Sequence, residues 1–245
     1  MVPHLSRAAL TLTLSLVLAV PAGAQDGFLF RAPALSVTLR ATHAAPRAEG
    51  DVFDFMTGEL TLDRGDFAAQ GFGIDAAVSL HERFALVLGV TRVQATRTSD
   101  FRDWVGDDDL PIEQTTQLLQ VPVTVSLRWY PLARGRSIAT HAWIPARLVP
   151  YLQAGGGYQW YRLTQRGDFV DYETLAIFRD DLRSSGSGAL AQVAGGLEYW
   201  VTPRVGVNAE GRYGWGSADL HRAFAEFDRI DLSGYQAALG LSFRF

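Results

Sequence analysis

The chain has 245 residues, a formal net charge of −4, no cysteine and 48% hydrophobic residues. This hydrophobic content is too high for a disordered chain, and an acidic chain without a basic stripe is a poor match for a nucleic-acid partner. The absence of cysteine excludes a disulfide-stapled secreted domain and the attachment of a lipid to an N-terminal cysteine.

The start of the chain has the pattern of a secretory signal peptide. A basic residue, Arg7, precedes an apolar run over 10–20, and the small residues 22–24 form a cleavage site. The apolar run is shorter than the about 20 residues that a transmembrane helix needs. We therefore expect residues 1–24 to be removed on export and residues 25–245 to form one domain.

The rest of the chain contains eight segments in which apolar and polar residues alternate with the period of two typical of β-strands. They span residues 33–42, 67–80, 84–98, 114–131, 147–166, 186–201, 205–219 and 232–245. Three-residue turns follow the second and sixth segments, and a longer link over 132–146 follows the fourth. On the opposite side, the predicted links are long and polar, over 43–66, 99–113, 167–185 and 220–231. Short turns on one side and long loops on the other are typical of a transmembrane β-barrel.

The two faces of these segments indicate which side of the sheet meets lipid. Residues 119–129 carry Leu, Val and Trp at odd positions, and Gln, Pro, Thr, Ser and Arg at even positions. A soluble barrel would place the apolar face inside and leave a face rich in small residues to the solvent. A membrane barrel directs the apolar face to lipid and fills a narrow lumen with small and polar side chains. The sequence therefore predicts an all-β fold, an eight-stranded antiparallel transmembrane β-barrel.

Aromatic residues gather near both ends of the predicted strands. Amphipathic rings are enriched at both membrane–water interfaces, so two belts of such residues are expected of a membrane barrel. The predicted belts are Trp129, Tyr130, Tyr199 and Trp200 on the turn side, and Tyr158, Trp160, Tyr213 and Trp215 on the loop side.

Charged residues on the inward faces are expected to meet inside the barrel. Counting from the turns predicts a mid-lumen network of Arg40, Asp75, Glu210 and Arg212, with Arg128 and Glu198 lower and Arg244 at the lower rim. Two interpretations stay open. The paired charges either only fill the lumen, or they form a gate whose ion pairs exchange partners to open a narrow pore.

The predicted loops hold most of the acidic residues, which are densest at 107–109. Their spacing does not fit a calcium-binding loop, so we expect a solvated acidic surface, no metal and no cofactor. The first loop is unusually apolar at Phe53, Phe55 and Met56. These side chains either fold over the barrel mouth, extend a hairpin above the membrane or contact a hydrophobic ligand.

Two stretches of the chain resemble strands of small outer-membrane barrels. The closing GLSFRF (240–245) and RLVPYLQAGGGYQWY (147–161) are similar to strands of the OmpA transmembrane-domain and OmpW-like families. The resemblance implies an outer-membrane location, with lipid and lipopolysaccharide as surroundings. It implies that the barrel-assembly machinery recognises the terminal residues Phe243 and Phe245, and that a small hydrophobic ligand is a further partner.

Three classes of function are compatible with such a barrel. The first is a structural or narrow-channel, passive-transport role, and the second is loop-mediated binding or adhesion. The third, a lipid-modifying enzyme, would use His43 or His221, the latter with Ser217 and Asp219 nearby, but no compact catalytic motif is present. We therefore expect no enzymatic activity and no catalytic residue.

Overall fold

The computed structural model describes residues 27–106, 109–139, 142–171 and 173–245. The predicted signal peptide, residues 1–24, lies outside the described residues, as do Asp107 and Asp108 of the acidic group. Among the described residues, no helix is long and apolar enough to cross a membrane.

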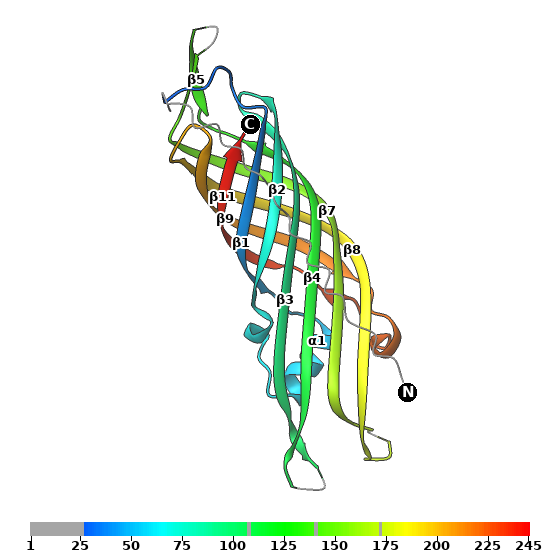
Figure 1. Ribbon diagram of the computed structural model, residues 1–245. Coiled ribbons are helices and arrows are strands. Elements are labelled where there is room, and N and C mark those ends of the chain that lie inside the picture. The colour runs from blue at the N-terminus through cyan, green and yellow to red at the C-terminus, as the bar shows by residue number, and fades with distance from the viewer. Residues whose placement is uncertain (1–26, 107–108, 140–141, 172) are drawn as a thin grey trace, which may run out of the picture.

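Eight long strands form one closed antiparallel ring (Figure 1). The strands are β1 Leu35–Pro46, β2 Ala69–His81, β3 Phe84–Val105, β4 Pro111–Trp129, β7 Leu148–Val170, β8 Ile177–Trp200, β9 Val205–Ala218 and β11 Gly234–Arg244. Each strand pairs with the next one along this series. The last strand, β11, pairs with β1 along its whole length and so closes the sheet on itself.

The outward face of the ring is apolar near the turns. On β4, Val123, Val125 and Leu127 are 37–49% exposed, while the intervening Thr124 and Ser126 are buried. Apolar side chains outside and polar side chains inside suit a protein whose solvent is lipid. The prediction of an eight-stranded antiparallel transmembrane β-barrel is confirmed.

Smaller elements lie at the two ends of the barrel. On the turn side, β5 Gly135–Ala139 and β6 Ala142–Pro145 form a hairpin between β4 and β7. A β-bridge between Leu29 and Trp143 attaches the start of the described chain to this hairpin. On the loop side, the links from β1 to β2 and from β9 to β11 contain α1 Asp51–Glu59, η1 Arg64–Phe67, η2 Arg222–Phe224 and β10 Ile230–Asp231.

Two of the predicted polar links are largely extensions of the strands. β3 extends to Val105 and β4 begins at Pro111, and β7 extends to Val170 and β8 begins at Ile177, where links over 99–113 and 167–185 were expected. These two tall hairpins project beyond the other loops (Figure 1). The prediction was wrong here because the apolar–polar alternation weakens above the lipid, although backbone pairing continues.

The loop side of the barrel encloses an apolar cluster, termed the head core. It consists of buried apolar residues of α1, η1 and η2 packed against inward-facing residues of β3, β4 and β7, among them Phe101, Ile112 and Leu163. Phe53 and Met56 of α1 are both 0% exposed within this cluster, and Phe55 remains 38% exposed. The structure therefore shows the first loop folded over the barrel mouth, and contact with a hydrophobic ligand stays a prediction.

Candidate functional site

A charged network fills the lumen of the spanning part, the portion of the barrel near the turns where the outward face is apolar. Arg40 forms salt bridges with Asp75 and Glu210, each at 3.0 Å, and Arg212 forms one with Glu210 at 2.7 Å. An Arg212 nitrogen also lies 3.9 Å from Asp75 Oδ2. The four side chains are at most 5% exposed. The structure thus brings together the four residues expected at mid-lumen depth.

A second group of charges lies closer to the turns and is continuous with the first. Arg128 Nη1 donates a hydrogen bond to Glu198 Oε1 at 3.0 Å, and Arg244 lies 3.5 Å from the other oxygen of that carboxylate. Arg128 Nη2 is also 3.8 Å from Glu210 Oε2, which links the two groups. Glu198 thus joins Arg128 to Arg244, and these are the three charged residues expected below the mid-lumen group.

Tyr130 and Trp200 belong to this network and not to a membrane-facing belt. The Tyr130 hydroxyl and the Trp200 indole N–H donate to Glu198 at 3.3 and 3.1 Å, and both residues are at most 3% exposed. The belt prediction is wrong for these two because successive residues of an extended chain point to opposite faces. Their neighbours Trp129 and Tyr199 take the outward positions and are 40% and 46% exposed.

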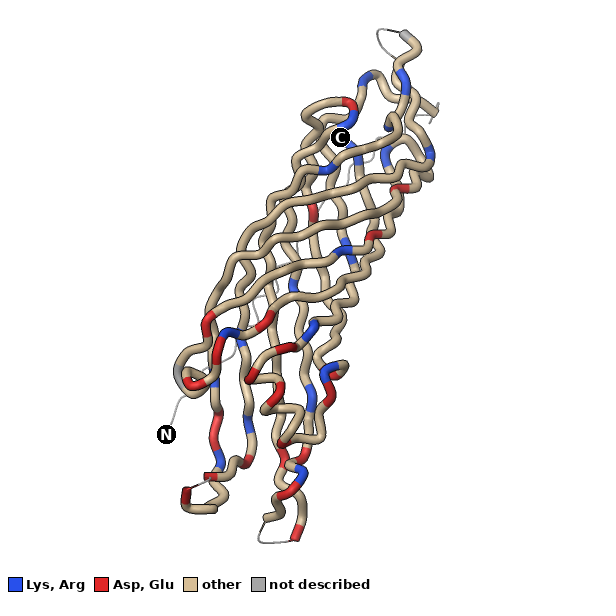
Figure 2. Tube along the Cα trace, turned by 180° about the vertical axis from the view of Figure 1, so that it is seen from behind, with Lys and Arg blue, Asp and Glu red and all other residues tan. Residues whose placement is uncertain are grey.

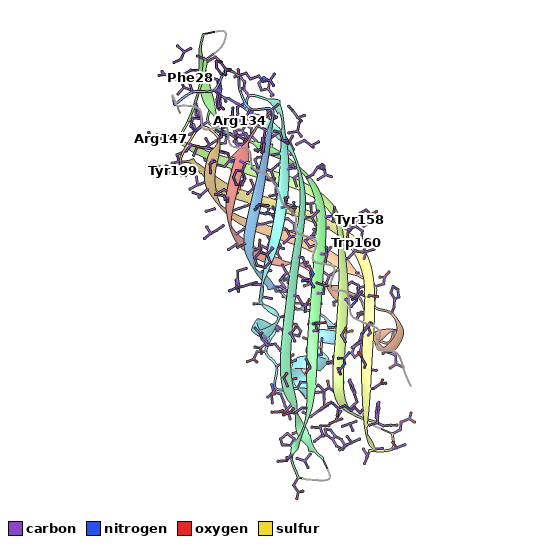
Figure 3. All side chains as sticks on the ribbon, in the orientation of Figure 1. Phe28, Arg134, Arg147, Tyr158, Trp160 and Tyr199 are labelled. Atoms are coloured by element: carbon purple, nitrogen blue, oxygen red, sulfur yellow. The ribbon has the colours of Figure 1, made fainter. Side chains whose placement is uncertain are left out.

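The other expected belt residues lie on the outward face. Tyr158 and Trp160 are 60% and 48% exposed, and Trp215 is 48% exposed. Tyr213 packs edge-on against Trp215, with ring centroids 4.7 Å apart. In Figure 3, Tyr158 and Trp160 point away from the barrel wall, and Tyr199 lies at the turn-side end. That these rings mark membrane interfaces stays a prediction.

The network includes a residue from every strand of the ring. Six strands supply the charged residues, and the other two supply neutral partners that were not predicted. Thr91 of β3 accepts a hydrogen bond from Arg40 at 3.0 Å, and the Tyr151 hydroxyl of β7 donates to Glu210 at 2.8 Å. The alternation over 147–161 places Tyr151 on the inward face, so its position was readable from the sequence, whereas nothing distinguished Thr91 from other inward threonines.

Close packing leaves little space around the charges. The Arg244 guanidinium lies 3.4 Å from the ring centroid of Trp200, within cation–π distance. Beside Asp75, the chain has Gly89, where a β-carbon would come within 2.5 Å of Asp75 Oδ1. A side chain at this position would displace the carboxylate from its arginine partners.

Two layers close the lumen, the charged network and the head core above it. The network contains four arginines and three carboxylates, all buried: Arg40, Arg128, Arg212, Arg244, Asp75, Glu198 and Glu210. Between the layers lies a cavity of about 20 Å³ that contacts Arg212 on one side and Leu232 of the head core on the other. Such a volume accommodates about one water molecule.

No family model matches the chain, and no curated protein matches it. Among solved structures, a major outer membrane protein from Thermus thermophilus is 8% identical, with 86% of this chain and 100% of that chain covered and a TM-score of 0.47. OprG from Pseudomonas aeruginosa is 13% identical (89% and 99% covered, TM-score 0.45), and Neisserial surface protein A is 14% identical (86% and 97%, TM-score 0.41). The fold is therefore assigned from the closed ring of strands. The chain is an eight-stranded transmembrane β-barrel.

The residues considered for catalysis come from two places in the barrel. His43 lies on the outward face of β1, paired in the sheet with Gln70 of β2, whereas Ser217, Asp219 and His221 lie at the loop end of β9. Asp219 forms a salt bridge with Arg229 at 3.0 Å. In the part of the chain that the structure describes, no group of three or more His, Asp or Glu side chains is placed to hold a metal ion.

Acidic residues gather at the loop end of the barrel (Figure 2). At the tip of the β7–β8 hairpin, the Asp171 carboxylate accepts hydrogen bonds from the backbone N–H groups of Thr174 at 3.1 Å and Glu173 at 2.8 Å. These bonds hold the pKa of Asp171 below its ordinary value. Lower on the hairpin, a hydrogen bond from Arg166 lowers the pKa of Asp181. Both carboxylates are therefore ionised at neutral pH.

Proposed function

We propose that this chain is an outer-membrane protein in which a closed barrel anchors a folded, acidic head, and that the head binds other molecules. The head core and the two tall hairpins together are termed the head. The apolar band on the outside of the barrel supports placement among lipid and lipopolysaccharide. Phe243 lies on the outward face of β11, and Phe245, which follows the strand, is 61% exposed. These two aromatic side chains suit recognition by the barrel-assembly machinery.

The closed lumen is the observation that carries the anchoring role. Arg40, Arg128 and Glu210 are 3%, 2% and 5% exposed, whereas residues lining a water-filled channel would be accessible to solvent. A barrel of eight strands has an interior just wide enough for its own side chains. Passage of a solute would require both the charged network and the head core to be displaced.

The tall hairpins support a binding role for the head. They rise past the other loops and carry acidic side chains such as Asp103, Glu113 and Asp180. Binding residues are often presented by loops on a rigid scaffold, and the head core supplies that rigidity here. Because the sequence contains no compact catalytic motif, binding is favoured over an enzymatic role.

Single-channel recording in planar bilayers tests the closed barrel. The protein would be refolded, with folding verified by heat-modifiable gel mobility, and we expect no discrete conductance steps. Deleting the hairpin tips 106–110 and 171–176 should remove binding by the head and leave the gel mobility of the barrel unchanged. Discrete steps from the intact protein would contradict the anchoring role.

A narrow channel is the second candidate, favoured by the shared partners in the network. Arg40 and Arg212 both contact Asp75 and Glu210, so one ion pair can break while each charge keeps a partner. Arg212→Ala separates the two functions. A channel gated by the network alone would conduct in this variant, whereas a barrel also closed by the head core stays silent. Arg162→Ala, the same change at an exposed position of β7, is the matched control.

A further inference from the structure

The head contains a second cavity, termed the phenylalanine pocket. Its volume is about 200 Å³. Six phenylalanines line it: Phe55, Phe101, Phe169, Phe178, Phe224 and Phe227. They come from α1, β3, the β7–β8 hairpin, η2 and the segment after η2. The pocket therefore exists only when these parts of the head are folded together.

The rings form two walls of the pocket. Phe169 and Phe178, paired across β7 and β8, are stacked with centroids 5.9 Å apart and an interplanar angle of 28°. Phe227 lies 5.5 Å from Phe55 and 6.4 Å from Phe224 by ring centroids. One ring of each wall reaches solvent, since Phe55 and Phe178 are 38% and 43% exposed. Exposed apolar rings that border a cavity are typical of a ligand-binding surface.

Two buried amides add polar groups to the lining. Gln114 and Gln165 are 2% and 3% exposed. Gln114 Nε2 donates to the Asp168 carbonyl at 2.8 Å, whereas Gln165 Nε2 reaches Thr116 Oγ1 only at 3.5 Å. A hydrogen bond at this distance is weak. Gln165 can therefore give up this bond for one to a molecule in the pocket.

We propose that the phenylalanine pocket binds a small, uncharged, monocyclic aromatic molecule whose hydroxyl group hydrogen-bonds to Gln165. A cavity of about 150 Å³ lined by Leu, Ile and Phe binds benzene. The somewhat larger pocket admits one ring with a small substituent. The phenylalanines supply stacked and edge-to-face contacts to such a ring. None of the lining residues is charged, so an ionised ligand would lose its hydration without gaining a counter-ion.

This inference rests on the proposed function, because it names a ligand class for the head. Binding would be measured by ¹⁹F NMR with the full barrel in lipid nanodiscs, after subtraction of the signal change in empty nanodiscs. The probes are 4-fluorophenol, fluorobenzene and 4-fluorobenzoate. We expect saturable, protein-dependent binding of the first two, tighter for 4-fluorophenol, and none for the carboxylate.

Variants locate the binding within the head. Phe178→Ala removes one exposed ring and should weaken 4-fluorophenol binding about fivefold to tenfold, as expected for the loss of one aromatic pair. Phe72→Ala, the same change at a position of β2 that is 78% exposed, should leave the affinity unchanged. Gln165→Leu should reduce the affinity for 4-fluorophenol to that for fluorobenzene, which has no hydroxyl group.

Three results would overturn the proposal: no saturable binding, equal binding of 4-fluorobenzoate, or an unchanged affinity in Phe178→Ala. The conductance experiment tests the closed anchor separately from the phenylalanine pocket. A conducting barrel that still binds 4-fluorophenol would refute only the closed anchor. A silent barrel that binds neither neutral probe would refute only the phenylalanine pocket.

Discussion

Strand β4 passes through two regions of the molecule, the spanning part and the head, and its outward face changes from apolar to polar on the way, while apolar residues appear on its inward face. Near the turns, Thr124 points inward and is buried, while Val125 points outward and is 49% exposed. Near the tip, Ile112 points inward and is 5% exposed, while Glu113 points outward. Even-numbered residues face inward along the entire strand, so the register does not change.

This difference shows that the solvent determines which face of the sheet is apolar. Lipid outside the spanning part demands an apolar exterior, and the interior is then held by paired charges and hydrogen bonds. Water outside the head restores the soluble arrangement, with an apolar interior and a polar exterior. On β4 the outward face changes from polar to apolar between Gln117 and Leu119, whereas the inward face near the tip mixes apolar residues, Ile112 and Leu118, with polar ones, Gln114 and Thr116. The change on the outward face places the edge of the lipid on this strand.

The largest expected effect comes from breaking the charged interior of the spanning part. Glu210→Ala removes the carboxylate shared by Arg40, Arg212 and Arg128, so each of these buried arginines loses one acidic partner. We expect a loss of about 3–5 kcal/mol in the free energy of unfolding, measured by urea titration in lipid vesicles. Glu113→Ala, at an exposed position of the same barrel, should change it by less than about 0.5 kcal/mol. Equal stabilities of the two variants would refute the structural importance of the network.

A charge placed on the outward face separates the two regions on one strand. Val125→Arg puts an arginine into lipid and should cost about 2–4 kcal/mol of unfolding free energy near the middle of the bilayer. Thr115→Arg places the same side chain on the outward face of the head and should cost almost nothing. Urea titration of both variants in vesicles measures the difference. A similar cost at both positions would mean that the apolar band does not end on β4.

Removing one methylene from the head core tests whether the head opens separately from the barrel. Ile112→Val should destabilise the packing around α1 by about 0.5–1.5 kcal/mol. Hydrogen exchange of the α1 amides should become faster, and the heat-modifiable mobility of the barrel should stay the same. If the variant instead lost barrel mobility, the head and the spanning part would form one cooperative unit.

The smallest effect concerns the tip of the β7–β8 hairpin. Because the pKa of Asp171 is lowered, the stability that its carboxylate contributes to the hairpin tip is fully present above the ordinary pKa of an aspartate. This contribution is lost as the pH falls through the lowered value, because the protonated carboxyl accepts the two backbone hydrogen bonds less well. Amide protons of Glu173 and Thr174 should therefore exchange faster, relative to an unstructured peptide at the same pH, as the tip is acidified. In Asp171→Ala this relative protection should be low at every pH, and protection retained in the variant would rule out the carboxylate as its source.

The sequence was sufficient for the spanning part because alternation directly encodes which residues face inward. Counting residues from the turns then gives their depth, which is why Arg40, Asp75, Glu210 and Arg212 could be grouped before any contact was known. The aromatic belts were predicted from depth alone, without the alternation. Tyr130, next to the outward Trp129, was therefore assigned to the wrong face.

The head was harder to predict because its local signals are weak. The helix α1 has only nine residues, and its N-cap residue, Gly50, has no side chain that could cap the helix. Its buried residues Val52, Phe53 and Met56 are held by the head core and not by local preference. The tall hairpins were missed for a related reason, since polar residues such as Gln114 and Thr116 occupy inward positions there and weaken the alternation by which a strand is recognised.

A cysteine scan along β4 tests the closed, two-region barrel most directly, because the natural chain contains no cysteine. Single cysteines at 111–129 would be exposed, in lipid vesicles, to a water-soluble and a lipid-soluble thiol reagent. We predict that odd positions of 113–117 react with the water-soluble reagent, that odd positions of 119–129 react with the lipid-soluble one, and that even positions react with neither. Reaction of the even positions 120–128 with the water-soluble reagent would show an open, water-filled lumen and contradict the account.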